Sequence, residues 1–110
     1  MRIAVLISGR GSNMVSLADA IPVDLVEIAL VAANTPCDGL TLAADRGLET
    51  ALVDRAAFAS KAEHETALGD AIEAAAVDWI CLAGYMAILS PAFIARFANR
   101  IINIHPSLLP

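Results

Sequence analysis

The sequence has little positive charge, no long apolar run and only two cysteines. Seven Lys and Arg against twelve Asp and Glu leave a net charge of -5, the wrong sign for a protein that binds a nucleic-acid backbone. A membrane-spanning helix needs about 20 consecutive apolar residues, and the sequence contains no such run. We therefore expect neither nucleic acid nor membrane as a partner, and a cytoplasmic location is the default expectation.

The two cysteines, Cys37 and Cys81, lie far apart and form no Cys-x-x-Cys or Cys/His pattern. The spacing predicts no zinc site, so we expect both thiols to be buried or incidental. The sequence is instead rich in apolar residues, with 58% hydrophobic and 17% charged among 110 residues. That composition predicts a packed core, and the length predicts a single domain over residues 1–110.

Short β-type runs alternate with Ala-rich helical stretches, the pattern of βαβ units. The predicted strands are Arg2–Ile7, Asp24–Ala33, Thr50–Val53, Asp78–Leu82 and Arg100–Ile104. The predicted helices are Ser12–Ile21, Gly39–Arg46, Lys61–Ala76 and Ser90–Phe97. The pattern predicts an α/β fold, with a Rossmann-like, open, mainly parallel sheet and helices on both faces.

A glycine-containing loop, Ser8–Asn13, connects the first strand to the first helix. Glycine allows a sharp turn and a close approach to a ligand, and the free N–H groups of a helix start attract an anion. The dinucleotide fingerprint is incomplete, since Met14 stands at the third glycine position and the second strand ends at Asn34 instead of an acid. The loop predicts a phosphate site more strongly than a nicotinamide site, and a connection without a ligand stays open.

Two polar side chains, Asn103 and His105, lie two residues apart at the end of the last predicted strand. Side chains two apart share one face of a strand, and ligands of open α/β sheets bind at the carboxyl edge. A lone His is more often structural, but the pair at this edge indicates catalysis. The apolar loop Ala83–Leu89 follows the fourth strand and either packs inward or forms the wall of a pocket for a flat heterocycle.

Four segments together resemble the glycinamide ribonucleotide formyltransferases, a folate-dependent family. They are Ile7-Ser-Gly-Arg-Gly-Ser-Asn13, Leu82-Ala-Gly-Tyr-Met86, Ile88-Leu-Ser-Pro-Ala-Phe93 and Ile102-Asn-Ile-His-Pro-Ser-Leu-Leu-Pro110, in the family's order. The resemblance implies transfer of a formyl group from 10-formyltetrahydrofolate to the amine of 5-phosphoribosylglycinamide in purine synthesis, with both small molecules as partners and no metal. A homodimer is one assembly that the sequence allows.

The resemblance also implies residue roles. The phosphate contacts it implies are Gly11, Ser12 and Asn13, and the folate contacts are Lys61, Met86, Ala87, Ile88, Leu89 and Asn103. Asn103 and protonated His105 would stabilise the oxyanion, and His105, with an ordinary pKa near 6.5, would act as general acid. Lys61 has an alternative reading as a solvated residue at a helix start.

Two departures from the family pattern stand out. Ala87 occupies a position where many members carry a larger, often basic residue, which affects side-chain contacts of that loop. Members also continue beyond Pro110 and supply an aspartate that supports the histidine. We therefore expect this chain to be the N-terminal part of a longer protein and to have little or no transferase activity alone.

Three other functions compete with this interpretation. Formyltetrahydrofolate hydrolases and methionyl-tRNA formyltransferases share related folate-site segments, but Ser8–Asn13 suits a small phosphorylated ribose and the acidic charge disfavours tRNA. A non-catalytic nucleotide-binding module would use the glycine loop only as an anchor. Such a module would not bind folate, and its affinity for glycinamide ribonucleotide would be unchanged when His105 is replaced by alanine.

Overall fold

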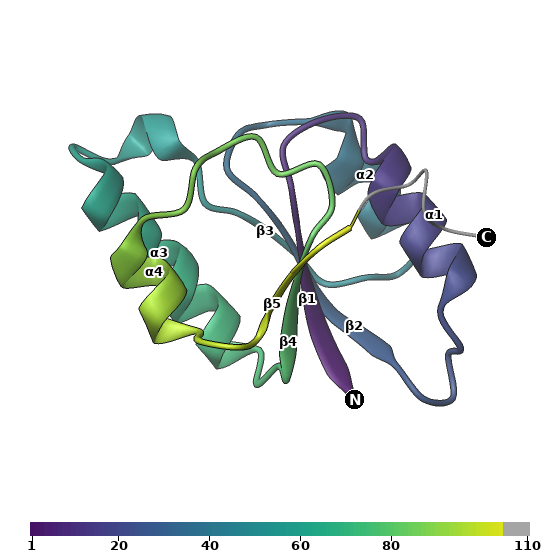
Figure 1. Ribbon diagram of the computed structural model, residues 1–110. Helices are drawn as coiled ribbons and strands as arrows, with labels where there is room; N and C mark the ends of the chain where they lie inside the picture. The colour runs from purple at the N-terminus through teal and green to yellow at the C-terminus, as the bar shows by residue number, and fades with distance from the viewer. Residues whose placement is uncertain (105–110) are drawn as a thin grey trace.

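The computed structural model describes residues 1–104, which form a five-stranded parallel sheet in the order β3-β2-β1-β4-β5 (Figure 1). The strands are β1 (Arg2–Ile7), β2 (Glu27–Ala33), β3 (Thr50–Leu52), β4 (Trp79–Leu82) and β5 (Ile101–Asn103). The helices are α1 (Ser12–Ala20), α2 (Asp38–Asp45), α3 (Lys61–Ala74) and α4 (Pro91–Arg96), with a 3-10 turn, η1 (Arg55–Ala57). The predicted α/β fold is confirmed.

The central strand β1 is covered on both faces, α1 and α2 lying on one side of the sheet and α3 and α4 on the other (Figure 1). Its side chains alternate between two cores. Ile7 packs with Met14 on the α1 side, and Leu6 packs with Ile72 and Phe97 on the α3 and α4 side. Each of these buried side chains contributes about 1.5–3 kcal/mol by leaving water, which explains why Ile3–Ile7 contains only apolar residues.

The order of the strands in the sheet changes direction after β3, so that the switch point lies between β1 and β4. The chain first moves outward through β2 to β3, and α3 then carries it back past β1 to β4. The connections that leave β1 and β4 at their carboxyl ends therefore go to opposite faces of the sheet. In open α/β sheets, this switch point opens a crevice in which ligands bind.

Several element ends differ from the sequence prediction. Strand β2 begins at Glu27 and not at Asp24, because the N–H groups of Leu25 and Val26 both donate to the Pro22 carbonyl, at 3.0 and 2.9 Å. That turn leaves Leu25 67% exposed. The start of α4 is as predicted, since Ser90 Oγ accepts a hydrogen bond from the Phe93 N–H at 3.2 Å.

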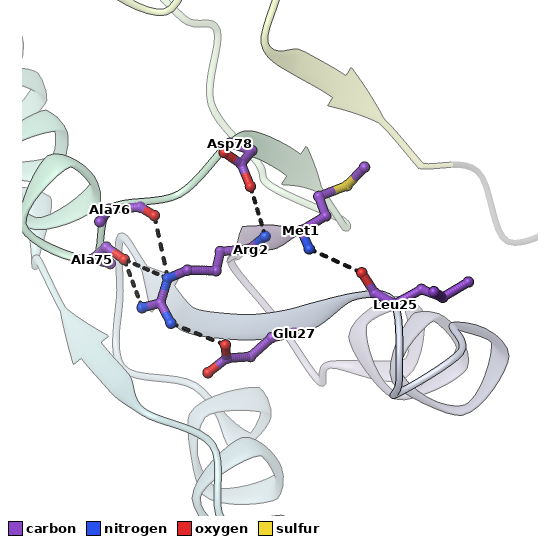
Figure 2. Close-up of polar contacts among 7 residues, drawn as sticks. All are labelled: Met1, Arg2, Leu25, Glu27, Ala75, Ala76 and Asp78. Carbon is purple, nitrogen blue, oxygen red and sulfur yellow. Dashed lines mark hydrogen bonds and ion pairs between the residues drawn. The ribbon is translucent and has the colours of Figure 1, made fainter.

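Arg2 ties together three elements at the amino edge of the sheet (Figure 2). Its guanidinium donates to the Ala75 carbonyl at 2.8 Å and pairs with the Glu27 carboxylate at 3.0 Å. Its backbone N–H donates to Asp78 at 2.9 Å. Ala75 follows α3, Glu27 begins β2 and Asp78 directly precedes β4, so these contacts hold neighbouring elements of the fold together.

Candidate functional site

The loop after β1 approaches the start of α2 very closely. Gly11 has φ +82°, and a Cβ there would lie 2.6 Å from the Cα of Gly39. The Gly39 N–H donates to the Gly9 carbonyl at 3.1 Å. Because only glycine tolerates both the left-handed backbone and this distance, the glycine residues of the loop bring the amino ends of α1 and α2 together.

The start of α1 is left without a side-chain cap by the residues that the structure describes. Gly11 occupies the cap position and offers no side-chain acceptor, and no acidic residue lies in the first turn. The first N–H groups of a helix have no intrahelical acceptor, and they carry the positive end of the helix dipole. Ser12 is exposed and Asn13 is half-buried at this end, so the predicted phosphate contacts sit where an anion is favoured.

The loop after β4, Ala83–Leu89, lies directly against the loop after β1. The Met86 N–H donates to Ser8 Oγ at 2.7 Å. Gly84 has φ +77°, and a Cβ on it would lie 3.4 Å from the Asn13 side-chain nitrogen. The structure therefore places the predicted phosphate loop and the predicted folate loop side by side, at the switch point between β1 and β4.

Two large apolar side chains of this second loop face solvent. Met86 is 73% and Ile88 is 84% exposed, whereas Leu89 is half-buried and packs against the core on the α3 and α4 side. Exposed apolar side chains grouped on one loop mark a surface on which a ligand or partner can pack. The loop thus packs inward at Ala83, Tyr85 and Leu89 but not at Met86 and Ile88.

A pocket of about 410 Å³ opens beside this loop. The residues that line it are Asn34, Arg55, Phe58, Ala59, Ser60, Lys61, His64, Glu65, Tyr85 and Ala87. Two predicted folate contacts, Lys61 and Ala87, therefore share one pocket. Lys61 and Arg55 are both exposed and pair with no carboxylate within residues 1–104, so the pocket mouth carries two positive charges.

The hydroxyl of Tyr85 remains protonated in this pocket. Burial raises the pKa of Tyr85 to about 12, and the nearby Glu65 carboxylate adds to the increase, while Arg55 and the Asn34 amide act in the opposite direction. A neutral phenol can both donate and accept a hydrogen bond. Tyr85 thus offers a ligand a polar group without adding negative charge.

Two buried polar side chains that line the pocket, Glu65 and His64, make hydrogen bonds to neighbouring segments. Glu65 accepts hydrogen bonds from the Ser90 N–H at 3.0 Å and from the Ser90 hydroxyl at 2.5 Å, which fixes the end of the Ala83–Leu89 loop to α3. His64 is buried, and its Nε2 contacts the Val53 carbonyl at 2.7 Å. These contacts favour structural roles for both side chains.

Asn103 lies on β5, paired in register with Leu82 of β4. The next residue, Ile104, donates its N–H to the Leu82 carbonyl at 2.9 Å. Asn103 therefore stands at the carboxyl edge, beside the strand that leads into the Ala83–Leu89 loop. His105 lies outside the described residues, so the Asn–His pair stays a prediction.

Asn34, Arg55, Glu65 and His64 are pocket residues that the sequence analysis did not identify. Asn34 directly follows β2 and so reaches the same carboxyl edge, which is the one sequence signal that could have identified it. The other three lie in η1 and α3, and their position depends on where α3 crosses the sheet. A helical pattern gives their spacing along α3 but not the strand ends that they face.

The rest of residues 1–104 shows no second site in which the predicted functional residues gather. A wider cleft of about 670 Å³ is lined by Arg2, Ile28, Arg46 and neighbouring residues, but it lies at the amino edge, away from both loops. Within residues 1–104 no three His, Cys, Asp or Glu side chains converge as a metal site requires. No helix in that range is long and apolar enough to cross a membrane.

The fold and the adjoining loops define an α/β protein whose two predicted ligand loops meet at the topological switch point of its sheet. A scan of protein families matches residues 1–110 to the family described as formyl transferase. The chain belongs to this formyl transferase family, as the sequence resemblance predicted.

Individual relatives are similar over nearly the whole chain. The phosphoribosylglycinamide formyltransferase of Haemophilus influenzae is 45% identical over 115 residues, covering 99% of this chain and 53% of the relative. The trifunctional purine biosynthetic protein adenosine-3 of Gallus gallus is 40% identical over 113 residues, covering 100% of this chain and 11% of that protein. The crystal structure of phosphoribosylglycinamide formyltransferase from Brucella melitensis has a TM-score of 0.89 at 46% identity, covering 99% of this chain and 58% of that one. The chain thus spans about half the length of these single-function relatives.

Proposed function

We propose that the protein carrying this chain transfers the formyl group of 10-formyltetrahydrofolate to the amine of 5-phosphoribosylglycinamide. The observation that carries the proposal is the contact between the two loops, Met86 N–H to Ser8 Oγ at 2.7 Å. A reaction between two bound molecules requires that their sites adjoin, because reacting atoms must approach to about 3–3.5 Å. Family membership and relatives named phosphoribosylglycinamide formyltransferase support the same reaction.

The loop Ser8–Asn13 binds the phosphate of the acceptor. Gly11, Ser12 and Asn13 lie at the uncapped start of α1, where N–H groups and the helix dipole favour an anion without requiring a basic side chain. Such a site holds the phosphorylated ribose while leaving its amine free. The amine then extends toward the carboxyl ends of β4 and β5.

The loop Ala83–Leu89 and Lys61 bind the formyl donor. Met86 and Ile88 supply exposed apolar surface for a flat ring, and the main chain at Ala87 and Leu89 supplies directional hydrogen bonds. Ala87 contributes no charge, but Lys61 and Arg55 lie at the same pocket. An anionic donor is attracted to this mouth despite the chain's net negative charge.

The chemistry is an acyl transfer. The amine nitrogen attacks the formyl carbon, and the carbonyl electrons move onto oxygen to give a tetrahedral intermediate. That intermediate collapses by breaking the bond to N10, while a proton passes from the attacking nitrogen to the departing one. Asn103 and His105 take the roles of oxyanion donor and general acid, because Asn103 stands at the carboxyl edge of β5 next to β4.

A coupled formyl-transfer assay on the full-length protein, with glycinamide ribonucleotide as acceptor, tests the proposal. Replacing His105 by alanine is expected to lower kcat by at least about 100-fold, as loss of a general acid does, with little change in ribonucleotide affinity. A wild-type protein that hydrolyses the donor without needing the acceptor would contradict the assignment. So would a His105→Ala variant with normal turnover.

A further inference from the structure

The side chain of Asn34 is buried, yet only half of its amide is satisfied. Asn34 is 1% exposed and stands at the carboxyl end of β2. Its Oδ1 accepts a hydrogen bond from the Ser8 hydroxyl at 2.8 Å. Its Nδ2 meets the geometric criteria for a hydrogen bond with no group of residues 1–104, although the amide lies close enough to the Tyr85 hydroxyl to lower the pKa of that phenol. Asn34 lines the 410 Å³ pocket beside Lys61 and Ala87.

The orientation of this amide follows from a chain of hydrogen bonds. The Met86 backbone N–H can only donate, so Ser8 Oγ must accept from it. The single Ser8 proton is then available for Asn34, whose Oδ1 accepts it. The NH₂ group consequently points away from Ser8.

An unpaired NH₂ at this depth is costly. A buried donor without an acceptor destabilises a protein by about 1–3 kcal/mol, and such groups are rare in native proteins. Rotating the amide would break the hydrogen bond in which Oδ1 accepts the Ser8 proton, so one hydrogen bond would be exchanged for another. The arrangement is therefore one that a ligand acceptor in the pocket would complete.

We propose that Asn34 is a ligand-binding residue whose NH₂ donates to a carbonyl or carboxylate oxygen of the formyl donor. Ser8 is a positioning residue, because it aims the Asn34 amide and anchors Met86 with the same hydroxyl. The inference rests on the proposed function for the identity of the ligand. The cations of Arg55 and Lys61 at the pocket mouth favour an oxygen with negative charge.

The side-chain NH₂ signal of Asn34 in a ¹⁵N-labelled full-length protein gives a direct measurement. Titration with 10-formylfolate, a stable oxidised analogue of the donor, is expected to shift both NH₂ protons and to slow their exchange with water about tenfold, consistent with one new hydrogen bond. The Asn34→Ser variant assigns the signal by removing it. If the main-chain amides of Ala83–Leu89 shift while the Asn34 NH₂ does not, the inference is overturned and the proposed function stands.

Two variants, with one control, distinguish the orientation of the Asn34 amide from a general loss of stability. Asn34→Asp keeps an acceptor for Ser8 but loses the donor, so we expect the KM for the formyl donor to rise at least about tenfold with kcat less affected. Ser8→Ala frees the amide to rotate and is expected to raise the same KM. Ser16→Ala makes the identical deletion on the exposed face of α1 and should leave KM unchanged.

Two further results would count against the inference. Tyr85 lines the same pocket, and a Tyr85→Phe variant that moves the ligand-free Asn34 NH₂ signal would make the phenol, not a ligand, its partner. Failure of 10-formylfolate to shift any signal, with normal binding of glycinamide ribonucleotide, would remove the proposed function together with the inference.

Discussion

Replacing Gly11 by alanine tests whether the close approach of α1 and α2 shapes the glycine loop. Two costs add at this position. An alanine at φ +82° costs about 1–2 kcal/mol in the left-handed region. Its Cβ would also lie 2.6 Å from the Gly39 Cα, a backbone atom, and overpacking of this kind costs about 1–3 kcal/mol.

We therefore expect Gly11→Ala to lower the free energy of unfolding by about 2–5 kcal/mol, the sum of those two ranges. Two other glycines separate the terms. Gly47 has φ +77° with nothing within 4 Å of a Cβ, so Gly47→Ala carries only the backbone cost of about 1–2 kcal/mol. Gly9 has open space and no positive φ, so Gly9→Ala should be within about 0.5 kcal/mol of neutral or slightly stabilising.

Urea unfolding of the three variants, followed by circular dichroism, measures these differences as shifts of the midpoint at constant slope. The order of stability should be Gly9→Ala, then Gly47→Ala, then Gly11→Ala. Equal losses for Gly11→Ala and Gly47→Ala would refute the reasoning, because the contact with Gly39 would then contribute nothing. A changed slope would instead report an altered native or unfolded ensemble.

Three further outcomes follow from the pocket walls and the core. Glu65→Ala leaves the Ser90 N–H and hydroxyl without their acceptor. Urea unfolding should therefore show a free energy of unfolding lower by about 1–3 kcal/mol. A decrease below about 0.5 kcal/mol would mean that water replaces the carboxylate. Tyr85 is the only tyrosine in the sequence, and its raised pKa of about 12 predicts that tyrosinate absorbance appears only near that pH. The stability that this neutral hydroxyl provides is complete below the ordinary pKa of about 10 and is lost as the pH rises toward 12; titration near pH 10 would contradict the burial. Burial raises the pKa of the Cys81 thiol, so maleimide should label the half-buried Cys37 first, and equal rates would show that Cys81 is accessible.

Local signals in the sequence predicted much of the fold correctly. The uninterrupted apolar run that ends at Ile7 predicted a strand buried on both faces, and β1 is that strand. The helix predicted over Ser90–Phe97 matches α4, where Ser90 caps the first turn and Pro91 begins it, and both residues act on that turn alone. Gly47 follows α2 with φ +77°, as a helix-ending glycine should.

The misplaced start of β2 shows where local reasoning stops. Leu25 is apolar, so the strand predicted from Asp24 extends through it. It is exposed instead, because the turn at Pro22 uses the N–H groups of Leu25 and Val26 that a strand would need. An apolar residue can be buried in a strand only if its backbone N–H is free to bond the neighbouring strand. Here a local acceptor, the Pro22 carbonyl, takes that bond.

The pocket depended on contacts between distant residues. Sequence motifs identified Ser8 and the loop around Met86 separately, but their hydrogen bond joins residues 78 positions apart. Asn34 entered the sequence analysis only as the end of a strand, since a buried amide differs from an exposed one only in what surrounds it. The strand order, which sets those neighbours, follows from the packing of α3 across the sheet.

The most direct measurement of the central claim is a map of ligand contacts on a ¹⁵N-labelled full-length protein. Glycinamide ribonucleotide should shift the amides of Ser8–Asn13, and 10-formylfolate should shift those of Ala83–Leu89. With either ligand bound, the Met86 amide that joins the loops should respond. Shifts clustered at the amino edge around Arg2 and Glu27, with both loops unmoved, would contradict a single crevice shared by the two substrates.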